Sequence, residues 1–278
     1  MRPELVAPPE IVYNADEAKK YTQNSRIISI QNEMTYRALE LLNLPTIDGE
    51  PVPSLILDIG CGSGLSSDVL SEEGHSWVGL DISQHMLSTA QSRNIEGGDL
   101  FLQDIGEGLG FRPGSFDGCI SISVLQWLCN ADASHHEPRA RLNRFFTTLY
   151  TSLSRGAKAV FQFYPAENQS ELIVSSAMKA GFTGGIVVDY PNSAKAKKYY
   201  LVLFAGYSGG SGPALPQGLQ DEQSVAYSRQ RIRDNRSVGR RPVKDKDWVL
   251  RKKELARIRG RQTANDSKYT ARKRNPKF

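Results

Sequence analysis

The sequence predicts an α/β fold with a seven-stranded, mostly parallel sheet of the Rossmann-like kind. Short apolar strands alternate with amphipathic helices from residue 55 to residue 181, a pattern typical of parallel βαβ units. Two further strand segments, 184–191 and 198–206, follow each other across a polar loop. Because a short connection joins antiparallel neighbours, we expect these two segments to complete the sheet as a C-terminal hairpin.

The elements follow one another in a regular order. Residues 15–44 form two helical stretches, and Leu44-Pro45 ends the second. A parallel sheet that ends in an antiparallel hairpin is the layout of the class I methyltransferase fold rather than of an NAD-binding Rossmann domain. Between the strands, the apolar periodicity predicts helices over 65–74, 83–93, 137–154 and 170–181. The expected strands are 55–59, 76–80, 99–103, 115–125, 157–164, 184–191 and 198–206.

Composition limits the kind of protein that this chain can be. Its 278 residues, 39% of them hydrophobic, are enough for one α/β domain with extensions. Apolar runs are too short to cross a membrane and the first residues lack a signal-peptide pattern, so we expect neither membrane association nor secretion. The three cysteines, Cys61, Cys119 and Cys129, show no CxxC spacing. We therefore expect reduced intracellular thiols and no metal site on this chain alone.

Basic residues gather at the C-terminus. Residues 209–278 hold 19 Lys and Arg against 7 Asp and Glu, whereas the preceding 208 residues hold 16 against 23. The Gly/Ser/Pro-rich run GYSGGSGPALPQG introduces this part of the chain and is typical of a flexible linker. The stretch 247–261 could become helical on a partner. The predicted division is an N-terminal helical lid (1–50), a class I methyltransferase domain (51–207), and a linker with a disordered basic tail (208–278) that engages a polyanion.

A glycine loop follows the first predicted strand of the sheet. In LILDIGCGSG, Gly60 and Gly62 flank Cys61 and Gly64 ends the segment. Glycines at such a turn let the backbone approach a ligand closely. Dinucleotide, phosphate and methyl-donor sites all use glycine loops, so the loop alone leaves the ligand open. Asp58, placed before the glycines, suits a cationic amino-acid group better than a phosphate, because two anions would repel.

Further polar side chains end the next three strands. Asp81, followed by Ile82, is placed to accept both ribose hydroxyls of an adenosine, as in NAD enzymes. Asp104 is placed to accept from the adenine 6-amino group, with Ile105 beside the ring. Ser121, Gln126 and Trp127 fall at the carboxyl edge of the fourth strand. This succession of strand ends favours S-adenosylmethionine as the cofactor.

The expected chemistry needs no metal and no covalent intermediate. A sulfonium methyl donor transfers its methyl group when the nucleophile, the methyl carbon and the sulfur are aligned. An acceptor that already carries a lone pair needs no general base, and the four histidines, at positions 75, 85, 135 and 136, are not expected to be catalytic. We therefore assign no catalytic residue with certainty.

Segments outside the glycine loop resemble one family. They are PPEIVYNADEAKKYTQNSRIISIQNEMTYRALELLNLP, the QWL after the fourth strand, VVDYPNSAKAKKYYLVLFAG and a basic tail that ends in TARKRNPKF. The chain resembles, over its whole length, the eukaryotic small-subunit (18S) rRNA guanine-N7 methyltransferases of ribosome biogenesis. The segments DYPNSAKAKK and NSRI-x-x-IQ are more specific to that family than the glycine loop is.

The resemblance implies a reaction and a set of contacts. One guanine of small-subunit rRNA would be methylated at N7, whose exposed lone pair needs no base. Ser121 and Gln126 would lie near the methionine end of the donor and the target base, which Trp127 or Tyr164 would hold. The N-terminal helix with Tyr21 and Arg26 would close over the donor.

The resemblance also implies partners and a location. A small zinc-binding activator subunit shared among several methyltransferases would form a stable heterodimer with this chain. The strand from residue 99 to 103, which begins with Asp99 and ends with Gln103, would be an exposed sheet edge where such a subunit adds a strand. Small-subunit rRNA in pre-ribosomal particles would bind the tail, and the protein would be in the nucleus and nucleolus and also in the cytoplasm.

Two alternatives remain open at this point. One is a class I methyltransferase that acts on a small molecule or a protein, which the basic tail disfavours. The other is a pre-ribosome assembly factor that retains donor binding while its presence on the particle matters more than methyl transfer. Intact donor-site residues such as Asp58 and Asp81 indicate donor binding without deciding between these roles.

Overall fold

The computed structural model divides into two units, residues 1–219 and 220–278, which are described separately. It describes residues 3–47, 50–133, 136–166, 169–193, 195–206 and 214–219, together with 250, 253, 257, 263, 265 and 266. The predicted lid, 1–50, is part of the first unit, and so is the described segment 214–219. The domain boundaries expected near residues 50 and 207 stay predictions.

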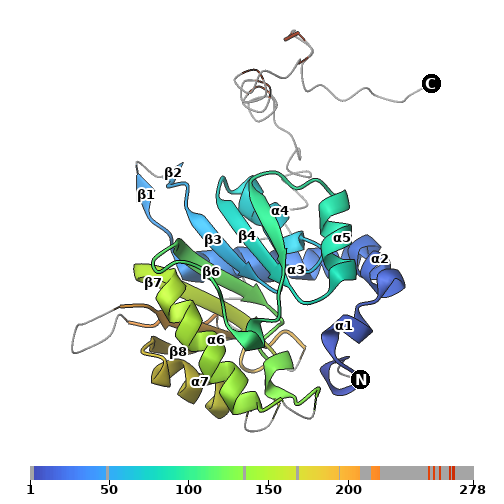
Figure 1. Ribbon diagram of the computed structural model, residues 1–278. Coiled ribbons are helices and arrows are strands. Elements are labelled where there is room, and N and C mark those ends of the chain that lie inside the picture. Colours follow the sequence, from blue (N-terminus) through green and yellow to red (C-terminus); the bar gives the residue numbers. More distant parts are fainter. Residues whose placement is uncertain are drawn as a thin grey trace. The chain divides into compact units, whose positions relative to one another are not determined.

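A seven-stranded sheet forms the centre of the first unit, with strand order β5-β4-β3-β6-β7-β9-β8 (Figure 1). Strands β3 to β7 run parallel, and β9 is antiparallel to both of its neighbours. This topology confirms the predicted fold class, including the C-terminal hairpin. The strands are β3 (Leu55–Ile59), β4 (Ser76–Asp81), β5 (Gly98–Leu102), β6 (Phe116–Ile122), β7 (Leu153–Phe163), β8 (Thr183–Asp189) and β9 (Lys198–Phe204).

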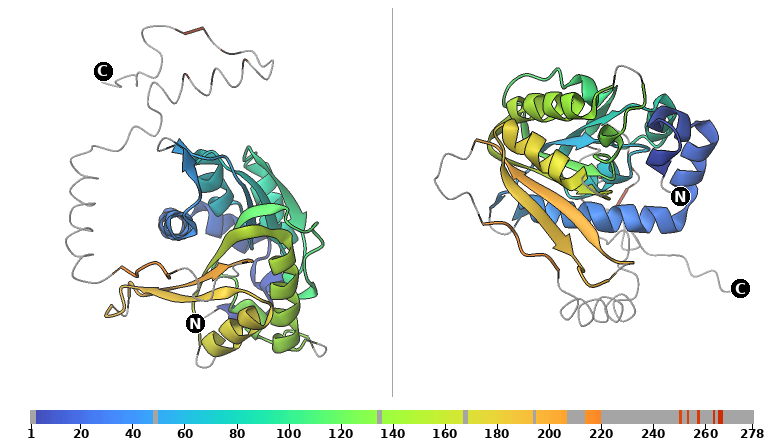
Figure 2. Two further views of the ribbon diagram at one scale, coloured as in Figure 1. Left: turned by 90° about the vertical axis from the view of Figure 1, so that its left-hand side faces the viewer. Right: turned by 90° about the horizontal axis from the view of Figure 1, so that it is seen from below.

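Helices cover both faces of this sheet (Figure 2). Apolar side chains of α3 and α4 pack on one face, and those of α6 and α7 pack on the other. Asn24 separates α2 from α3 because its side chain caps the second helix by accepting from the backbone N–H groups of Arg26 and Ile27. The helices are α1 (Pro9–Val12), α2 (Ala15–Gln23), α3 (Ser25–Leu42), α4 (Leu65–Glu72), α5 (Gln84–Ser92), α6 (Pro138–Ser152) and α7 (Gln169–Lys179), with 3-10 turns η1 (Pro3–Leu5), η2 (Ile105–Glu107) and η3 (Trp127–Cys129).

Two strand boundaries differ from the expected ones by three residues or more. The fourth strand ends at Ile122 rather than three residues later, because Ser123 adopts φ 65°, which breaks the extended chain. The fifth strand begins at Leu153, within the predicted helix, since Leu153 pairs with Phe116. A small hairpin, β1 (Thr46–Ile47) with β2 (Glu50–Pro51), forms where a loop was expected.

The two edges of the sheet differ. Among the described residues β5 pairs with β4 alone, and its Phe101 and Leu102 are 48% and 60% exposed. At the other edge, the segment 214–219 meets the end of β8: Leu219 donates its N–H to Asp189 Oδ1 (2.9 Å) and accepts from the N–H of Tyr190 (2.8 Å). The edge expected from the sequence at residues 99–103 is therefore present as a sheet edge.

Asp189 also joins this edge to α3. Its carboxylate is 2% exposed and accepts from Arg37 Nε (2.9 Å) and Nη2 (3.1 Å). The same guanidinium donates to the carbonyl of Gln217 (3.1 Å). These bonds to a buried carboxylate and to its arginine partner fix the segment 214–219 against the rest of the first unit.

Most of the predicted linker and tail lies outside the described residues. In the stretch expected to become helical, Leu250, Lys253 and Arg257 are helical and the other residues are not described. Asp266 accepts from Lys253 Nζ (2.9 Å) and Arg257 Nη2 (2.6 Å). Among the residues described, no helix has both the length and the apolar character to span a membrane.

Candidate functional site

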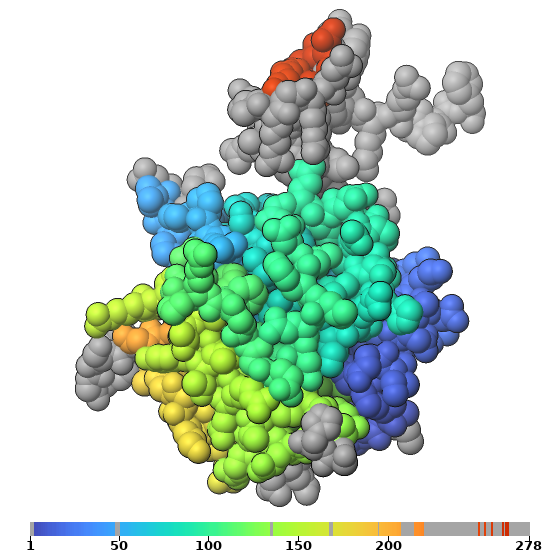
Figure 3. All heavy atoms as spheres, in the orientation of Figure 1, coloured from blue at the N-terminus to red at the C-terminus, as the bar shows by residue number. Residues whose placement is uncertain are grey.

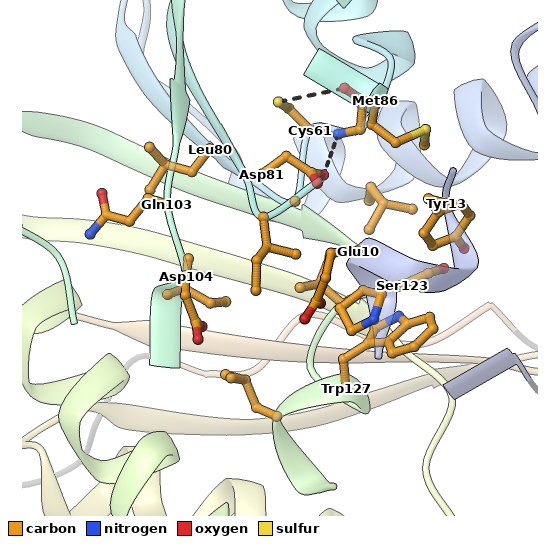
Figure 4. A pocket seen from close by; sticks show the side chains of 18 of the residues that line it. Glu10, Tyr13, Cys61, Leu80, Asp81, Met86, Gln103, Asp104, Ser123 and Trp127 are labelled. Carbon is orange, nitrogen blue, oxygen red and sulfur yellow. Dashed lines mark hydrogen bonds between the residues drawn. The ribbon is translucent and has the colours of Figure 1, made fainter. Parts of the chain in front are cut away.

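A cavity of about 390 Å³ opens at the carboxyl ends of β3, β4, β5 and β6. This is the position where open α/β sheets bind their ligands. The glycine loop, Asp81 and Asp104 line it from the sheet, as Figure 4 shows. The N-terminal segment closes one side with Glu10 and Tyr13. In Figure 3 this dark blue segment lies beside the teal and green parts of the surface.

At the glycine loop, backbone atoms rather than side chains form the cavity wall. Gly60 has φ 68°, and a Cβ there would overlap Val124 Cγ2. Gly62 has φ 55°, and its Cβ would lie 3.0 Å from Met86 Cε. A side chain at either position would therefore be strained and would fill space next to the ligand. The N–H groups of Gly60 and Cys61 both donate to the carbonyl of Leu80, at 2.7 and 3.0 Å, which fixes the loop on β4.

Asp81 is held by the backbone on both sides. Its Oδ2 accepts from the N–H of Gly62 (2.9 Å), as Figure 4 shows. Its Oδ1 accepts from the N–H of Ser83 (2.7 Å). Burial raises the pKa of Asp81 to about 6, although the amide donors of Ser83, Gly62 and Ile82 oppose that rise. The carboxylate thus stands at the cavity wall with lone pairs left for hydroxyl donors.

Asp58 lies beside the cavity without lining it. The residue is 1% exposed, and its Oδ2 accepts from the hydroxyls of Ser66 (2.7 Å) and Ser67 (2.8 Å) at the start of α4. Burial raises the pKa of Asp58 to about 6, against the effect of these two hydroxyls. The observed contacts stabilise the junction between β3 and α4, and contact with a cationic ligand stays a prediction.

Asp104 forms a bidentate ion pair that the sequence did not reveal. Arg141 Nη2, from α6, lies 2.7 Å from Oδ1 and 2.9 Å from Oδ2, and the N–H of Gly106 donates to Oδ1 (2.8 Å). Arg141 is itself 7% exposed and lines the cavity. The signal that could have found it is a charged residue in line with Phe145 and Leu149 on the buried face of the helix.

Aromatic side chains from the lid meet Trp127 from the 3-10 turn η3, which follows β6. The ring centroid of Tyr13 lies 5.9 Å from that of Tyr21 and 6.0 Å from that of Trp127. Ser83 Oγ donates to the carbonyl of Tyr13 (2.9 Å), and Asn130 Nδ2 donates to that of Glu4 (2.7 Å). These bonds fix the N-terminal segment over the cavity. Burial raises the pKa of Tyr13 to about 12, so its hydroxyl stays neutral.

The structure brings some of the predicted residues together and separates others. Arg26 is exposed at the start of α3, and Tyr164 Oη lies 3.6 Å from Met34 Sδ. These two, with Asp58, Gly64, Ser121 and Gln126, do not line the cavity. The predicted residues that do line it are Tyr21, Gly60, Cys61, Gly62, Asp81, Ile82, Asp104, Ile105 and Trp127.

Two of the residues outside the cavity have structural contacts instead. Ser121 Oγ donates to the carbonyl of Ile59 (2.8 Å) and thus joins β6 to β3. Gln126 Nε2 donates to the carbonyl of Ser123 (2.9 Å). The functional roles assigned to these residues from the sequence stay predictions.

Several lining residues had no signal in the sequence. Glu10, Tyr13 and Met86 belong to this group, because only the packing of the lid and of α5 brings them to the cavity, whereas Gln103 lines it directly after the end of β5. His136 also lines it, and its Nε2 lies 2.8 Å from Arg141 Nη1. His135 lies outside the described residues. No group of three or more metal-ligating side chains occurs in the part of the chain that the structure describes.

Solved structures share this architecture. The phosphoethanolamine N-methyltransferase 2 of Haemonchus contortus in complex with S-adenosyl-L-methionine matches with a TM-score of 0.51 and 17% identity, over 70% of this chain and 58% of that one. An S-adenosylmethionine-dependent methyltransferase from Aquifex aeolicus matches with a TM-score of 0.50 and 15% identity, over 69% and 98%. At these identities the likeness concerns the fold.

Sequence comparison narrows the class. Residues 57–161 match the model of a methyltransferase domain, and residues 203–276 match a family described as methyltransferase involved in Williams-Beuren syndrome. The 18S rRNA (guanine-N(7))-methyltransferase of Mus musculus is 54% identical over 284 residues, which cover 100% of this chain and 98% of that protein. The 18S rRNA (guanine(1575)-N(7))-methyltransferase of Saccharomyces cerevisiae is 53% identical, with coverage of 100% and 99%.

The chain combines a Rossmann-like sheet, a glycine loop that is hydrogen-bonded to β4, and a match to a methyltransferase domain. Together these features define a methyltransferase of the Rossmann-like class. Within that class, identity above 50% along the whole length decides the family. The chain belongs to the 18S rRNA (guanine-N7)-methyltransferases. This membership confirms the family resemblance seen in the sequence.

The position of Asp81 leads to a binding prediction. Its replacement in Asp81→Asn removes the charged acceptor for hydroxyl donors and lowers the affinity for S-adenosylhomocysteine by about ten- to a hundred-fold. In the unaltered protein the affinity weakens as the pH falls from 7 to 5, because the carboxyl then binds a proton that it must release to accept both hydroxyls. Calorimetric titration at both pH values measures each effect.

Asp68→Asn is the matched control for this substitution. Asp68 lies on α4, its side chain is 51% exposed and it pairs with Arg93 outside the cavity. The control should keep the affinity and the pH dependence of the unaltered chain. An Asp81→Asn protein that binds as tightly as the unaltered one at pH 7 would contradict the assigned role.

Proposed function

We propose that this protein methylates a guanine at N7 in small-subunit rRNA during ribosome biogenesis, with S-adenosylmethionine as the methyl donor. The observation that carries the proposal is identity of 50–54% over the full chain, tail included, with relatives named for this reaction in animals, yeasts, a plant and Dictyostelium discoideum. The cavity at the sheet edge provides the site for the donor.

The residues present fit this donor. Asp81 offers a carboxylate to the ribose hydroxyls, and Asp104 offers one to the adenine amine, while the glycine loop leaves room for the amino-acid part. Arg141 is the only Arg or Lys along the described lining of the cavity, and Asp104 neutralises it. A ligand with a positive sulfur therefore meets a wall whose acidic groups outnumber its basic ones.

Methyl transfer to this acceptor needs alignment rather than proton transfer. S-adenosylmethionine, when bound, supplies a methyl group on a positively charged sulfur. The lone pair of guanine N7 forms the new bond to the methyl carbon as the carbon–sulfur bond breaks, and the positive charge passes to the purine. The chain's own residues bind, orient and exclude water. Of the predicted base contacts Gln126, Trp127 and Tyr164, Trp127 alone lines the cavity, so we assign the stacking contact to it.

The exposed edge strand supports the proposed zinc-binding activator subunit as a partner. The backbone of β5 has an unpaired edge among the described residues, and Phe101 and Leu102 beside it are half-exposed or more. Strand addition would pair the free N–H and C=O groups and cover these apolar side chains.

The basic tail supports rRNA in pre-ribosomal particles as the second partner, and the nucleus and nucleolus, with the cytoplasm, as the location. Its balance of 19 basic against 7 acidic residues suits phosphate contacts, which give affinity without sequence preference. The same charge density suits nuclear import signals such as RKKELARIRGR. The residues that line the cavity would then select the target base.

A substitution at Asp81 tests the proposed reaction in cells. Asp81→Lys places a cation where the ribose should bind and therefore should abolish N7-methylguanine in small-subunit rRNA, as mapped by primer extension. Normal methylation would contradict the proposal. Loss of the modification with unchanged growth would mean that the essential role is assembly of the particle rather than methyl transfer.

A charged side chain on β5 tests the activator interface. Phe101→Asp or Leu102→Asp should abolish co-purification of the subunit, because a carboxylate would be buried without a partner in the new strand pair. Ile47→Asp is the control, since Ile47 is 67% exposed on the β1–β2 hairpin, away from that strand. Unchanged complex formation in both β5 variants would refute this interface.

Removal of the tail tests its two proposed roles. The deletion should span residues 220–278, because the segment 214–219 bonds to β8 and belongs to the first unit. Loss of the basic side chains should weaken binding to pre-ribosomal particles and slow nuclear entry, followed by sedimentation and by fluorescence of a tagged protein. If both remain intact, the tail has neither role.

A further inference from the structure

Arg141 is a buried cation on the wall of the donor cavity. It lies in the first turn of α6 and is 7% exposed. Both oxygens of Asp104 lie within 3 Å of its Nη2, at 2.7 and 2.9 Å. Burial of an arginine carries a large desolvation cost, which here is offset by the ion pair with the Asp104 carboxylate.

Several contacts together fix the orientation of Asp104. The N–H of Gly106 donates to Oδ1 (2.8 Å) from the turn that follows. Gly106 also packs directly against the guanidinium, and a Cβ at this glycine would overlap Nε. On its other side, Arg141 Nη1 lies 2.8 Å from Nε2 of His136. The carboxylate is thus held from two sides, and its charge is stabilised by a cation that cannot lose its proton.

A carboxylate held in this state can only accept hydrogen bonds. An exocyclic amine on a purine donates to it, whereas a 6-oxo group would place a second acceptor against it. Arg141 and Gly106 fix the direction in which the two oxygens point, so that the carboxylate presents acceptors of fixed geometry to the purine. The lone pairs that Arg141 and Gly106 do not use remain for the ligand.

We propose that Arg141 is a positioning residue that makes the donor cavity selective for a 6-aminopurine over a 6-oxopurine, by fixing the orientation of the accepting Asp104 carboxylate. This inference rests on the proposed function, which places adenine beside Asp104. It assigns to α6 a role in donor recognition in addition to its packing against the sheet.

The neighbouring ion pair on the same helix provides a matched control. Arg144 pairs with Glu107 one turn further along, and the two side chains are 49% and 59% exposed. Neither residue lines the donor cavity. Arg144→Met therefore removes an arginine from α6 without touching the proposed contact.

The test compares two ligands in calorimetric titrations of the full-length chain. The ligands are S-adenosylhomocysteine and S-inosylhomocysteine, which differ in having an amine or an oxygen at purine C6. The unaltered protein should prefer the adenine form by at least about tenfold. In Arg141→Met that preference should fall to less than about threefold, mainly through weaker binding of the adenine form. Arg141→Lys keeps the positive charge but lacks the planar guanidinium, so its preference should lie between those of the unaltered protein and Arg141→Met. Arg144→Met should show the same preference as the unaltered protein.

The ratio of the two affinities separates selectivity from stability. Loss of an ion pair that only supports the fold would weaken both ligands equally and lower the melting temperature, leaving the ratio unchanged. An unchanged ratio in Arg141→Met would therefore overturn the inference, and if that variant does not fold, the ratio in Arg141→Lys decides in the same way. Failure of the unaltered chain to bind S-adenosylhomocysteine would instead contradict the donor assignment itself and overturn both proposals.

Discussion

The junction between the glycine loop and the end of β4 is the constraint on which the site depends. The carbonyl of Leu80 accepts two loop N–H groups and the next side chain, Asp81, accepts a third from Gly62. The loop is therefore fixed by the strand beside it rather than by its own sequence. Without this junction the cavity would lose one wall and the carboxylate of Asp81, which we propose as the ribose contact, would lose its orientation.

Burial and charge act together around this junction. Asp58 and Asp81 are both enclosed, and burial raises the pKa of each to about 6. Asp104, by contrast, is paired with a cation. Carboxylates therefore stand in two electrostatic states at this end of the sheet: Asp58 and Asp81 are buried without a cation, and Asp104 is already neutralised by one. A donor whose positive charge lies at one end and whose base lies at the other matches this arrangement.

The sequence predicted those features that depend on neighbours along the chain. The seven strands, the glycine loop and Asp81 follow from alternation of apolar segments and from side chains placed directly at strand ends. Asp58 precedes the end of β3 by one residue, and side-chain alternation turns it towards Ser66 and Ser67 of α4, so it does not line the cavity and its expected contact with the ligand stays a prediction.

Contacts between distant segments were beyond the sequence pattern. Arg141 reaches Asp104 across 37 positions only because α6 packs beside the turn after β5. Tyr13 reaches the cavity through a bond from Ser83, 70 positions away. Neither pairing leaves a periodic signal, and each was visible only as an unexplained polar or aromatic residue. In related sequences, a polar or aromatic residue on a short or otherwise apolar element should therefore be considered as a contact to a distant segment.

The bonds that hold the segment 214–219 against β8 also determine where the basic tail begins. Leu219 is anchored through Asp189 and Tyr190, so the chain beyond it starts from a fixed point on the catalytic unit. The RNA contact that we propose for the tail would make it a tether of set origin and at most 59 residues in length. Once the tether is engaged, the effective concentration of the cavity near its target is on the order of millimolar, so a weak grip on a single base suffices for a long encounter.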